Sequence, residues 1–303
     1  MMAILNRKAS LIVLAANFAV VVIVLVFHSH TSYHKEQLHL CPSVHVGVTW
    51  INDIKATESM TAEEIYRYLH WTNSTSCQTA IDFGLRILKN DGVIAPDGYT
   101  AVCLDQSISP VFNNCLVYSF GIHNQWTFDE DMADFGCHVY SFDPSMNVGN
   151  HNRSERIHFY DIGLDGKNRL HPTTGWKMRT ASSIYHMLTS QHGATTIIDV
   201  LKMDIEFSEW DAIPQMLQSG FLTDKVKQLA VEIHFNPDDP LEAFRHRVQI
   251  LRNLEATSQN RGAGGFVRFS SRPNPWLKRP LKVLGGREDY TGLELAWYNS
   301  KYY

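Results

Sequence analysis

The sequence has no surplus of basic residues and few charged residues overall. Its 303 residues include 27 Lys plus Arg against 31 Asp plus Glu, and charged residues make up 19 % of the chain. Proteins that bind a phosphate backbone generally carry a basic surplus, so nucleic acid is not an expected partner. The mean hydropathy of −0.20 excludes several membrane spans, whereas a hydrophobic content of 44 % is enough for a folded core.

Several sequence motifs that are diagnostic of a particular enzyme class or metal site are also absent. The chain contains no GxGxxG, no P-loop lysine motif and no GxSxG elbow, which disfavours a dehydrogenase, a kinase-like ATPase and an α/β-hydrolase. It contains no CxxC and no HExxH, which disfavours a zinc ribbon, a thioredoxin motif and a zinc protease. Internal repeats and low-complexity tracts are absent as well.

One long apolar run stands near the start of the chain. It extends from Leu11 to Phe27, follows Arg7 and Lys8, and approaches the length needed to cross a hydrocarbon core of ~30 Å. No Ala-x-Ala site follows it, so the sequence predicts a retained signal-anchor, with a cleaved signal peptide as the alternative. The basic flank then stays in the cytosol, which predicts a single-pass type II membrane protein facing the endoplasmic reticulum or Golgi lumen, or a secreted protein after cleavage.

The sequence after this run contains features suited to a lumenal location. Asn73-Ser74-Thr75 and Asn152-Arg153-Ser154 satisfy the N-glycosylation rule and predict a glycoprotein. The five cysteines all follow the run: Cys41, Cys77, Cys103, Cys115 and Cys137. An oxidising lumen could pair four of them, and buried free thiols are the alternative. Cys115 and Cys137 begin strands expected to be neighbours, so a disulfide between them is geometrically conceivable.

Apolar strands alternate with amphipathic helices over the second half of the chain. The expected strands are 116–120, 138–142, 157–160, 196–203, 229–235, 265–269 and 293–298. Such alternation predicts an α/β fold with a doubly wound, mostly parallel sheet. Earlier, Thr61-Ala-Glu-Glu64 predicts a capping box for a short helix. The expected organisation is a cytosolic tail (1–10), a transmembrane signal-anchor (11–27), a lumenal stem with its leading segment (28–75) and the main domain (76–303).

Small or acidic residues follow the expected strands. Gly121 follows the first strand, Asp143 the second, Asp161 the third, and Asp204 with Glu206 the fourth. The carboxyl ends of parallel strands form one edge of a sheet, where ligands bind beside the topological switch point. An Asp after a strand is also a common turn or N-cap residue, so any one position is ambiguous and the set is the stronger signal.

A family resemblance gives these positions a specific chemistry. The segments CLVYSFG (115–121), YSFDPS (140–145) and LKMDIE-x-x-EW (201–210) closely resemble the methyltransferase-like protein 24 family and the broader FkbM-type methyltransferases. The resemblance implies a Rossmann-like class I methyltransferase fold with seven strands, the last of them antiparallel. It implies S-adenosylmethionine as the cofactor.

Site residues follow from the same resemblance. Ser119 and Gly121 would form the turn under the methionine part of the cofactor, Asp143 would hold the ribose hydroxyls, and Asp161-Ile162 would lie near the adenine. Asp204 and Glu206 would be the catalytic pair that faces the methyl group and the acceptor. The chain departs from the broad pattern in two places: Ser119 occupies an acidic position, and Glu206-Phe207 replaces Glu-Gly.

The resulting hypothesis is O-methylation of a small-molecule, glycan or lipid-linked acceptor. A hydroxyl acceptor needs a base, for which Asp204, Glu206, Glu232 and His234 are the candidates. One alternative is a methyltransferase fold that only binds ligands. Another is a Golgi glycosyltransferase with Asp204 and Glu206 on Mn²⁺ or Mg²⁺. Glu232-x-His234 could also ligate a metal alongside Asp204, although no metal ligand belongs to the main hypothesis.

Overall fold

The computed structural model describes residues 56–90, 92–255 and 264–303, which belong to one compact unit, Ile54–Tyr303. The expected signal-anchor at 11–27 and most of the expected stem lie outside the described residues. Within the part that is described, no helix has both the length and the apolar character to cross a membrane.

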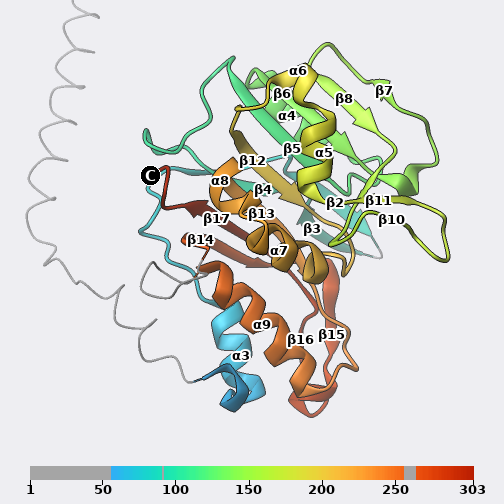
Figure 1. Cartoon of the computed structure of the whole chain (residues 1–303). Coiled ribbons are helices and arrows are strands. Elements are labelled where there is room, and N and C mark those ends of the chain that lie inside the picture. Colours follow the sequence, from blue (N-terminus) through green and yellow to red (C-terminus); the bar gives the residue numbers. More distant parts are fainter. Residues whose placement is uncertain (1–55, 91, 256–263) are drawn as a thin grey trace, which may run out of the picture. The chain divides into compact units, whose positions relative to one another are not determined.

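A mixed sheet of eight strands forms the centre of this unit (Figure 1). Its strands are β5 (Cys115–Phe120), β6 (Cys137–Phe142), β7 (His151–Asn152), β8 (Ile157–Tyr160), β12 (Ile198–Met203), β13 (Val226–His234), β14 (Phe266–Pro273) and β17 (Gly292–Asn299). They lie in the order β14-β17-β13-β12-β5-β6-β8-β7. Strands β8, β6, β5, β12 and β13 are parallel neighbours, whereas β17 runs antiparallel between β13 and β14.

This order confirms the expected mostly parallel sheet with an antiparallel last strand. Short β7 is an additional antiparallel strand at the edge beside β8. Strand β5 has β6 on one side and β12 on the other, so the chain reverses its direction of travel across the sheet after β8. The switch point therefore lies at the carboxyl ends of β5, β6 and β12, where a ligand cavity is expected.

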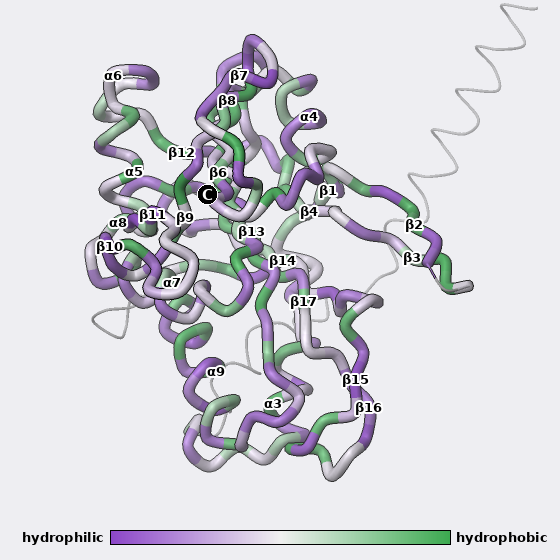
Figure 2. The backbone as a smooth tube through the Cα atoms, turned by 90° about the vertical axis from the view of Figure 1, so that its right-hand side faces the viewer, coloured by the Kyte–Doolittle hydropathy of each residue, from purple (hydrophilic) through white to green (hydrophobic). Residues whose placement is uncertain are grey.

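Helices cover both faces of the sheet, because the central strands are buried on both sides. The α-helices are α3 (Ala62–His70), α4 (Thr127–Asp134), α5 (Ala181–Met187), α6 (Thr189–His192), α7 (Glu209–Gln218), α8 (Phe221–Lys225) and α9 (Leu241–Glu255). Alternate residues of β5 point to opposite faces: Tyr118 joins a core formed with α5, α7, α8 and α9, whereas Val117 packs with α4. Figure 2 shows α5, α7 and α8 on one side of the sheet and α4 on the other.

Short strands, which the strand pattern did not predict, surround the sheet, and all but one of their pairings are antiparallel. They are β1 (Ala80–Phe83) with β4 (Thr100–Cys103), β2 (Arg86–Asn90) with β3 (Val93–Asp97), β10 (Arg169–Leu170) and β9 (Gly163–Leu164) on either side of β11 (Lys177–Arg179), and β15 (Lys278–Pro280) with β16 (Glu288–Tyr290). The 3₁₀ turns are η1 (Thr57–Ser59), η2 (Pro144–Met146), η3 (Pro275–Leu277) and η4 (Lys282–Leu284). The β2–β3 hairpin projects from the body of the molecule (Figure 2).

Helix α3 begins with the expected capping box. The Thr61 amide donates to Glu64 Oε2 (2.7 Å), and the Glu64 amide donates to Thr61 Oγ1 (3.2 Å). Ile65 and Leu69, on the apolar face of the helix, are fully buried in the main core. The helix was expected in the segment that leads into the domain, but it packs as part of the domain itself, against α9 and β14.

Two disulfides link four of the cysteines. Cys115 bonds to Cys137 across directly paired positions of β5 and β6, with the Cα atoms 4.5 Å apart. Cys77 bonds to Cys103 of β4. The Cys115–Cys137 bond is the disulfide between neighbouring strands that the sequence analysis described as geometrically conceivable. Each bridge restricts the unfolded chain and contributes on the order of 3 kcal/mol to stability.

Candidate functional site

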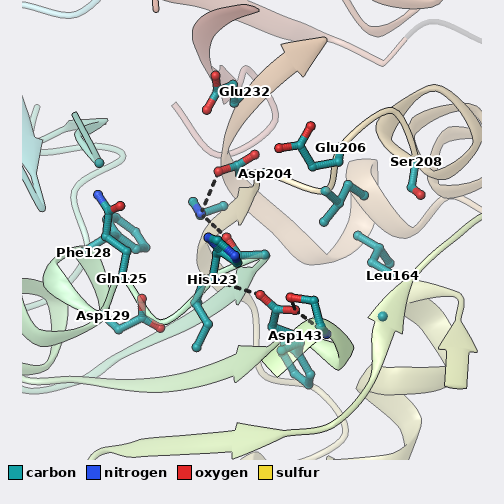
Figure 3. A pocket seen from close by; sticks show the side chains of 18 of the residues that line it. His123, Gln125, Phe128, Asp129, Asp143, Leu164, Asp204, Glu206, Ser208 and Glu232 are labelled. Carbon is teal, nitrogen blue, oxygen red and sulfur yellow. Dashed lines mark hydrogen bonds and ion pairs between the residues drawn. The ribbon is translucent and has the colours of Figure 1, made fainter. Parts of the chain in front are cut away.

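A cavity of about 430 Å³ opens at the carboxyl ends of β5, β6 and β12. In Figure 3, Asp204, Glu206 and Glu232 lie toward one end, and Asp129 and Asp143 toward the other. Seven acidic side chains line the cavity, and Lys202 is the one Lys or Arg among its described lining residues; the acids are Asp97, Asp129, Asp143, Asp204, Glu206, Glu232 and Glu294. The cavity therefore favours a positively charged ligand.

The turn after β5 brings two strand ends unusually close. Gly121 has a φ of 73°, and a Cβ on it would lie 1.6 Å from the carbonyl oxygen of Asp204. Only glycine fits there, because both the left-handed backbone and the contact exclude a side chain. Lys202 Nζ donates to the Gly121 carbonyl (3.0 Å) and lies 3.9 Å from Asp204 Oδ2, which ties the first and fourth strand ends together.

Asp143 follows β6 and reaches the cavity, as the strand-end argument predicts. One carboxylate oxygen accepts from the His123 amide (2.7 Å), and the other accepts from the Ser145 amide (2.7 Å) and hydroxyl (2.6 Å). The carboxylate is therefore both the N-cap of η2 and an anchor for the turn after β5. Oδ1 accepts two of these hydrogen bonds and Oδ2 one, so about one acceptor position of the carboxylate, on Oδ2, is left for a ligand.

Ser119 does not reach the cavity wall, but its partner does. Ser119 is fully buried, and its hydroxyl donates to Asp129 Oδ2 (3.3 Å), while the Ser141 hydroxyl donates to Asp129 Oδ1. Burial raises the pKa of Asp129 to about 6, despite these hydrogen bonds and the charge of Lys202. In the broader pattern the position of Ser119 is acidic. In this chain the carboxylate beside that position comes from Asp129 on helix α4.

Sequence reasoning missed Asp129 because an acid in the first turn of a helix is typical of a residue that stabilises the helix dipole. The N-cap of α4 is Trp126, and the Thr127 hydroxyl donates to the Gly84 carbonyl (2.8 Å). A usable signal was the pairing of Ser119 with Ser141, two hydroxyls at directly paired positions of β5 and β6. A buried hydroxyl needs a hydrogen-bond partner, and one carboxylate that faces both serines can accept a hydrogen bond from each of them.

Replacing Asp129 with Asn is expected to stabilise the protein by about 3 kcal/mol near pH 7 and by little near pH 4. The folded pKa of about 6 lies above the ordinary 3.8, so the wild type loses stability as the pH rises between these two values. Urea unfolding at both pH values measures the difference. Asp134→Asn, an exposed site on the same helix, is the control, and a gain at Asp129 that is equal at both pH values would contradict the assignment.

Asp161 and Ile162 do not line the cavity. The Asp161 carboxylate is turned to the surface, 3.6 Å from Lys177 Nζ, and Ile162 packs into the main core. The neighbouring residues Gly163 and Leu164 line the wall instead, together with Trp176 and Met178 from the β11 region. The structure therefore brings the residues just after Asp161-Ile162, and not these two, into the cavity wall.

Asp204 and Glu206 follow β12 and both line the cavity. Glu206 and Phe207 have φ values of 48° and 74°, a left-handed backbone that costs roughly 1 kcal/mol or more per non-glycine residue. Glycine adopts a left-handed backbone without this cost, which explains why the broader pattern has glycine at the position of Phe207. The Phe207 ring offsets part of that cost by packing on His234, with ring centroids 5.8 Å apart.

The end of β13 adds Glu232 and His234 to the site. His234 Nδ1 lies 3.2 Å from Oε1 of the fully buried Glu209, and the same oxygen accepts from the His234 amide (2.8 Å). Burial lowers the pKa of His234, but the hydrogen bond and charge of Glu209 outweigh it and raise the pKa to about 9. Burial, with the charge of Asp204, raises the pKa of Glu232 to about 7. A metal could be held by Asp204, Glu232 and His234.

A second cavity, of about 250 Å³, adjoins the first. Asp97, Glu206 and Glu232 line both, so the acidic cluster stands where they meet. Leu88 from the β2–β3 hairpin and Trp276 from η3 form part of its wall. Two joined cavities suit a reaction between two ligands, one on each side of Asp204 and Glu232.

Comparison with known proteins identifies similar chains. Residues 68–278 match the family described as a methyltransferase domain. Two curated proteins called probable methyltransferase-like protein 24 are similar: the human one is 26 % identical over 255 residues and the rat one 28 % over 252 residues. Each match covers 79 % of this chain, which spans 66 % of the length of each relative. The resemblance expected from the sequence is confirmed.

A solved structure was also matched. It is a SAM-dependent methyltransferase from Agrobacterium tumefaciens, with a sequence identity of 12 % and a TM-score of 0.33, covering 80 % of each chain.

Proposed function

This chain belongs to the methyltransferase-domain family, and we propose that it transfers a methyl group from S-adenosylmethionine to an acceptor hydroxyl. The observation that carries the proposal is the joined pair of cavities. Asp143, Asp129 and Asp204 line the first, and Glu206 and Glu232 line both. When bound, S-adenosylmethionine supplies an electrophilic methyl on a sulfonium, which leaves as neutral thioether once the acceptor oxygen takes the methyl and loses its proton.

The residues of the first cavity fit this cofactor. Its volume of about 430 Å³ is within the range of small-molecule sites, and its acidic lining suits the positive sulfonium and amino groups. Asp143 would hold the ribose hydroxyls. Asp129 lies near the turn after β5, where its carboxylate would face a positively charged group of the cofactor. Gly121 keeps that turn free of side-chain atoms.

Asp204 and Glu206 would then orient the acceptor and remove its proton. Both carboxylates belong to the turn that Gly121 contacts, so their backbone is fixed against the first-strand turn. Positioning supplies much of the rate in a transfer of this kind, and a general base adds about 10²–10⁴-fold. The same acidic lining disfavours the anionic diphosphate of a nucleotide sugar, which argues against a glycosyltransferase.

The proposed location is the secretory pathway, with a glycan or lipid-linked group as the acceptor. The apolar run at 11–27 and the two sequons support it, and so do the two disulfides, because disulfides persist in oxidising compartments. The membrane contact through the N-terminal run is part of this proposal.

Calorimetry of the full chain against S-adenosylmethionine and S-adenosylhomocysteine tests the proposal. We expect both to bind, and we expect Asp143→Ala to weaken binding by about 10–100-fold, because a charge-assisted hydrogen bond to the ribose is lost. Asp224→Asn, an exposed site near the start of β13, should change nothing.

The outcome separates the alternatives. No binding of either compound would leave a methyltransferase fold that serves as a binding module for something else. A Mn²⁺-dependent thermal shift with nucleotide sugars, without one for S-adenosylmethionine, would favour the glycosyltransferase. Circular dichroism of Asp143→Ala and of the milder Asp143→Asn shows whether the turn after β5 survives.

A further inference from the structure

The imidazole of His234 points into a ring of carboxylates. Its Nε2 atom lies 3.8 Å from Asp204 Oδ1, 3.7 Å from Glu206 Oε2 and 3.7 Å from Glu232 Oε1. These separations exceed a hydrogen bond, so Nε2 has no hydrogen-bond partner among the described residues. Only 7 % of the side chain is exposed. Nε2 therefore faces three carboxylates without a hydrogen bond to any of them, and His234 lines the second cavity.

The other ring nitrogen is fixed. Glu209 Oε1 lies 3.2 Å from His234 Nδ1 and is itself held by the His234 amide. The Glu209 carboxylate holds a proton on Nδ1, so Nε2, which faces Asp204 and Glu232, is the nitrogen that can bind a cation once its own proton leaves. This carboxylate–histidine pairing is the arrangement that orients metal-binding histidines.

We propose that Asp204, Glu232 and His234 bind a divalent transition-metal cation, of the type of Mn²⁺, that positions the acceptor. Their ligand atoms all lie within 4.8 Å of one another, and opposite ligands around an ion with bonds of ~2.1 Å are about 4.2 Å apart. An imidazole with two carboxylates suits a first-row transition metal better than Ca²⁺. Asn274 Nδ2 donates to Glu232 Oε1 (2.7 Å) and orients that ligand from outside.

The carboxyl groups of the cluster offer oxygen ligands to a cation. Four acids gather at this end of the cavity, where Glu232 and Glu294 share a hydrogen bond and burial raises the pKa of both, and Lys202 Nζ lies 3.9 Å from Asp204 Oδ2; the acids are Asp204, Glu206, Glu232 and Glu294. Like charges this close repel one another in a partly buried site. A divalent ion between Asp204 and Glu232 offsets that repulsion.

The position of the cluster defines the acceptor class, and this step rests on the proposed function. Glu232 lines both cavities, so a cation on it faces the acceptor side as well as the cofactor side. Three protein ligands leave open positions on a six-coordinate ion, which suit two neighbouring oxygens of one acceptor. We therefore assign acceptors that chelate, such as a sugar with adjacent hydroxyls.

The cation also lowers the pKa of a coordinated hydroxyl. The O–H bond breaks and its proton passes to Glu206, whose side chain is 77 % exposed and so exchanges it with water. The freed oxygen forms the new bond to the methyl carbon, while the bond from that carbon to sulfur breaks and its electron pair stays on sulfur. The roles divide accordingly: Asp204, Glu232 and His234 hold the ion, and Glu206 takes the proton.

Titration of the full chain with Mn²⁺ alone, by calorimetry and pulsed electron paramagnetic resonance, tests the site. We expect one ion per chain and a nitrogen coupling from one imidazole. Glu209→Ala should weaken binding by about 10–100-fold, and Asp204→Asn and His234→Gln by roughly 100-fold or more, because ligands outweigh the partners that orient them. His234→Gln should also remove the nitrogen coupling, and Asp224→Asn should bind as the wild type does.

Several results would overturn the proposal: no Mn²⁺ or Zn²⁺ binding by the wild type, a nitrogen coupling that persists in His234→Gln, or unchanged methyl transfer after treatment with a chelator. The wild-type coupling needs no variant, so a misfolded variant leaves the test intact. Mn²⁺ binding by a chain that ignores S-adenosylmethionine refutes the proposed function alone. Binding of S-adenosylmethionine without Mn²⁺ refutes only the metal site.

Discussion

Asp204→Asn is expected to lower methyl transfer by about 10²–10⁴-fold while changing the dissociation constant of S-adenosylmethionine by less than about 3-fold. Asp204 lines the first cavity at the end where Glu232 lies, away from Asp143, so its loss removes a contact on the proposed acceptor side and leaves the ribose side of the site intact. The measurement is transfer of a tritiated methyl group from S-adenosylmethionine to the glycan and glycolipid fraction of a microsomal extract, with calorimetry of the cofactor alongside.

The control for this prediction is Asp224→Asn, the same chemical change at an exposed ion pair with Lys301. It should transfer at the wild-type rate. Normal turnover by Asp204→Asn would remove Asp204 from the catalytic assignment. A loss of cofactor binding as large as the loss of turnover would show that Asp204 shapes the first cavity and has no separate role toward the acceptor.

Arg268→Met is expected to lower the free energy of unfolding by about 3–5 kcal/mol, the largest stability effect we foresee. Arg268 is 2 % exposed, and its Nε donates to Glu255 Oε1 (2.6 Å). One guanidinium nitrogen also donates to the carbonyls of Tyr68 (2.9 Å) and Trp71 (3.2 Å) at the end of α3. The substitution leaves the Glu255 carboxylate without its counter-charge and the backbone carbonyls of Tyr68, Leu69 and Trp71 with fewer donors.

Urea unfolding with the disulfides intact measures this effect. Arg268→Met combined with Glu255→Gln should recover much of the loss, because the unpaired charge disappears with its partner. Lys301→Met, which breaks the exposed pair with Asp224, should cost less than about 1 kcal/mol. If the double variant is as unstable as the single one, the loss comes from packing and the ion pair is not its cause.

The sequence predicted the sheet well, because its strands are short apolar runs ended by turn residues. The boundaries of the strand Ile157–Tyr160 were found to the residue, and those of β5 and β6 within one. The short strands around the sheet were missed. Strands of two to five residues, such as β9 and β2, carry too few positions to show a period, and β2 is mostly exposed.

Cavity residues could be predicted from the sequence where the end of a parallel strand alone determines their position. Asp143, Asp204 and Glu206 reach the cavity because each follows a parallel strand at the switch point. Asp161 follows a strand too, yet its side chain turns outward, since local loop geometry fixes direction and a one-dimensional pattern does not. Asp129 could not be found from strand ends, because it comes from a helix and is held at the cavity by two serines of neighbouring strands.

The packing of α3 sets the shortest fragment of this chain that can be expected to fold. A fragment starting at residue 76, the domain boundary suggested by sequence, would lack Ile65 and Leu69 from the core and the carbonyl groups that receive Arg268. It would expose the apolar faces of α9 and β14 to solvent, which favours aggregation. A fragment that begins ahead of Thr57 keeps these contacts, including the hydrogen bond from Thr57 to Gln249 of α9, and is the sensible starting point for crystallisation.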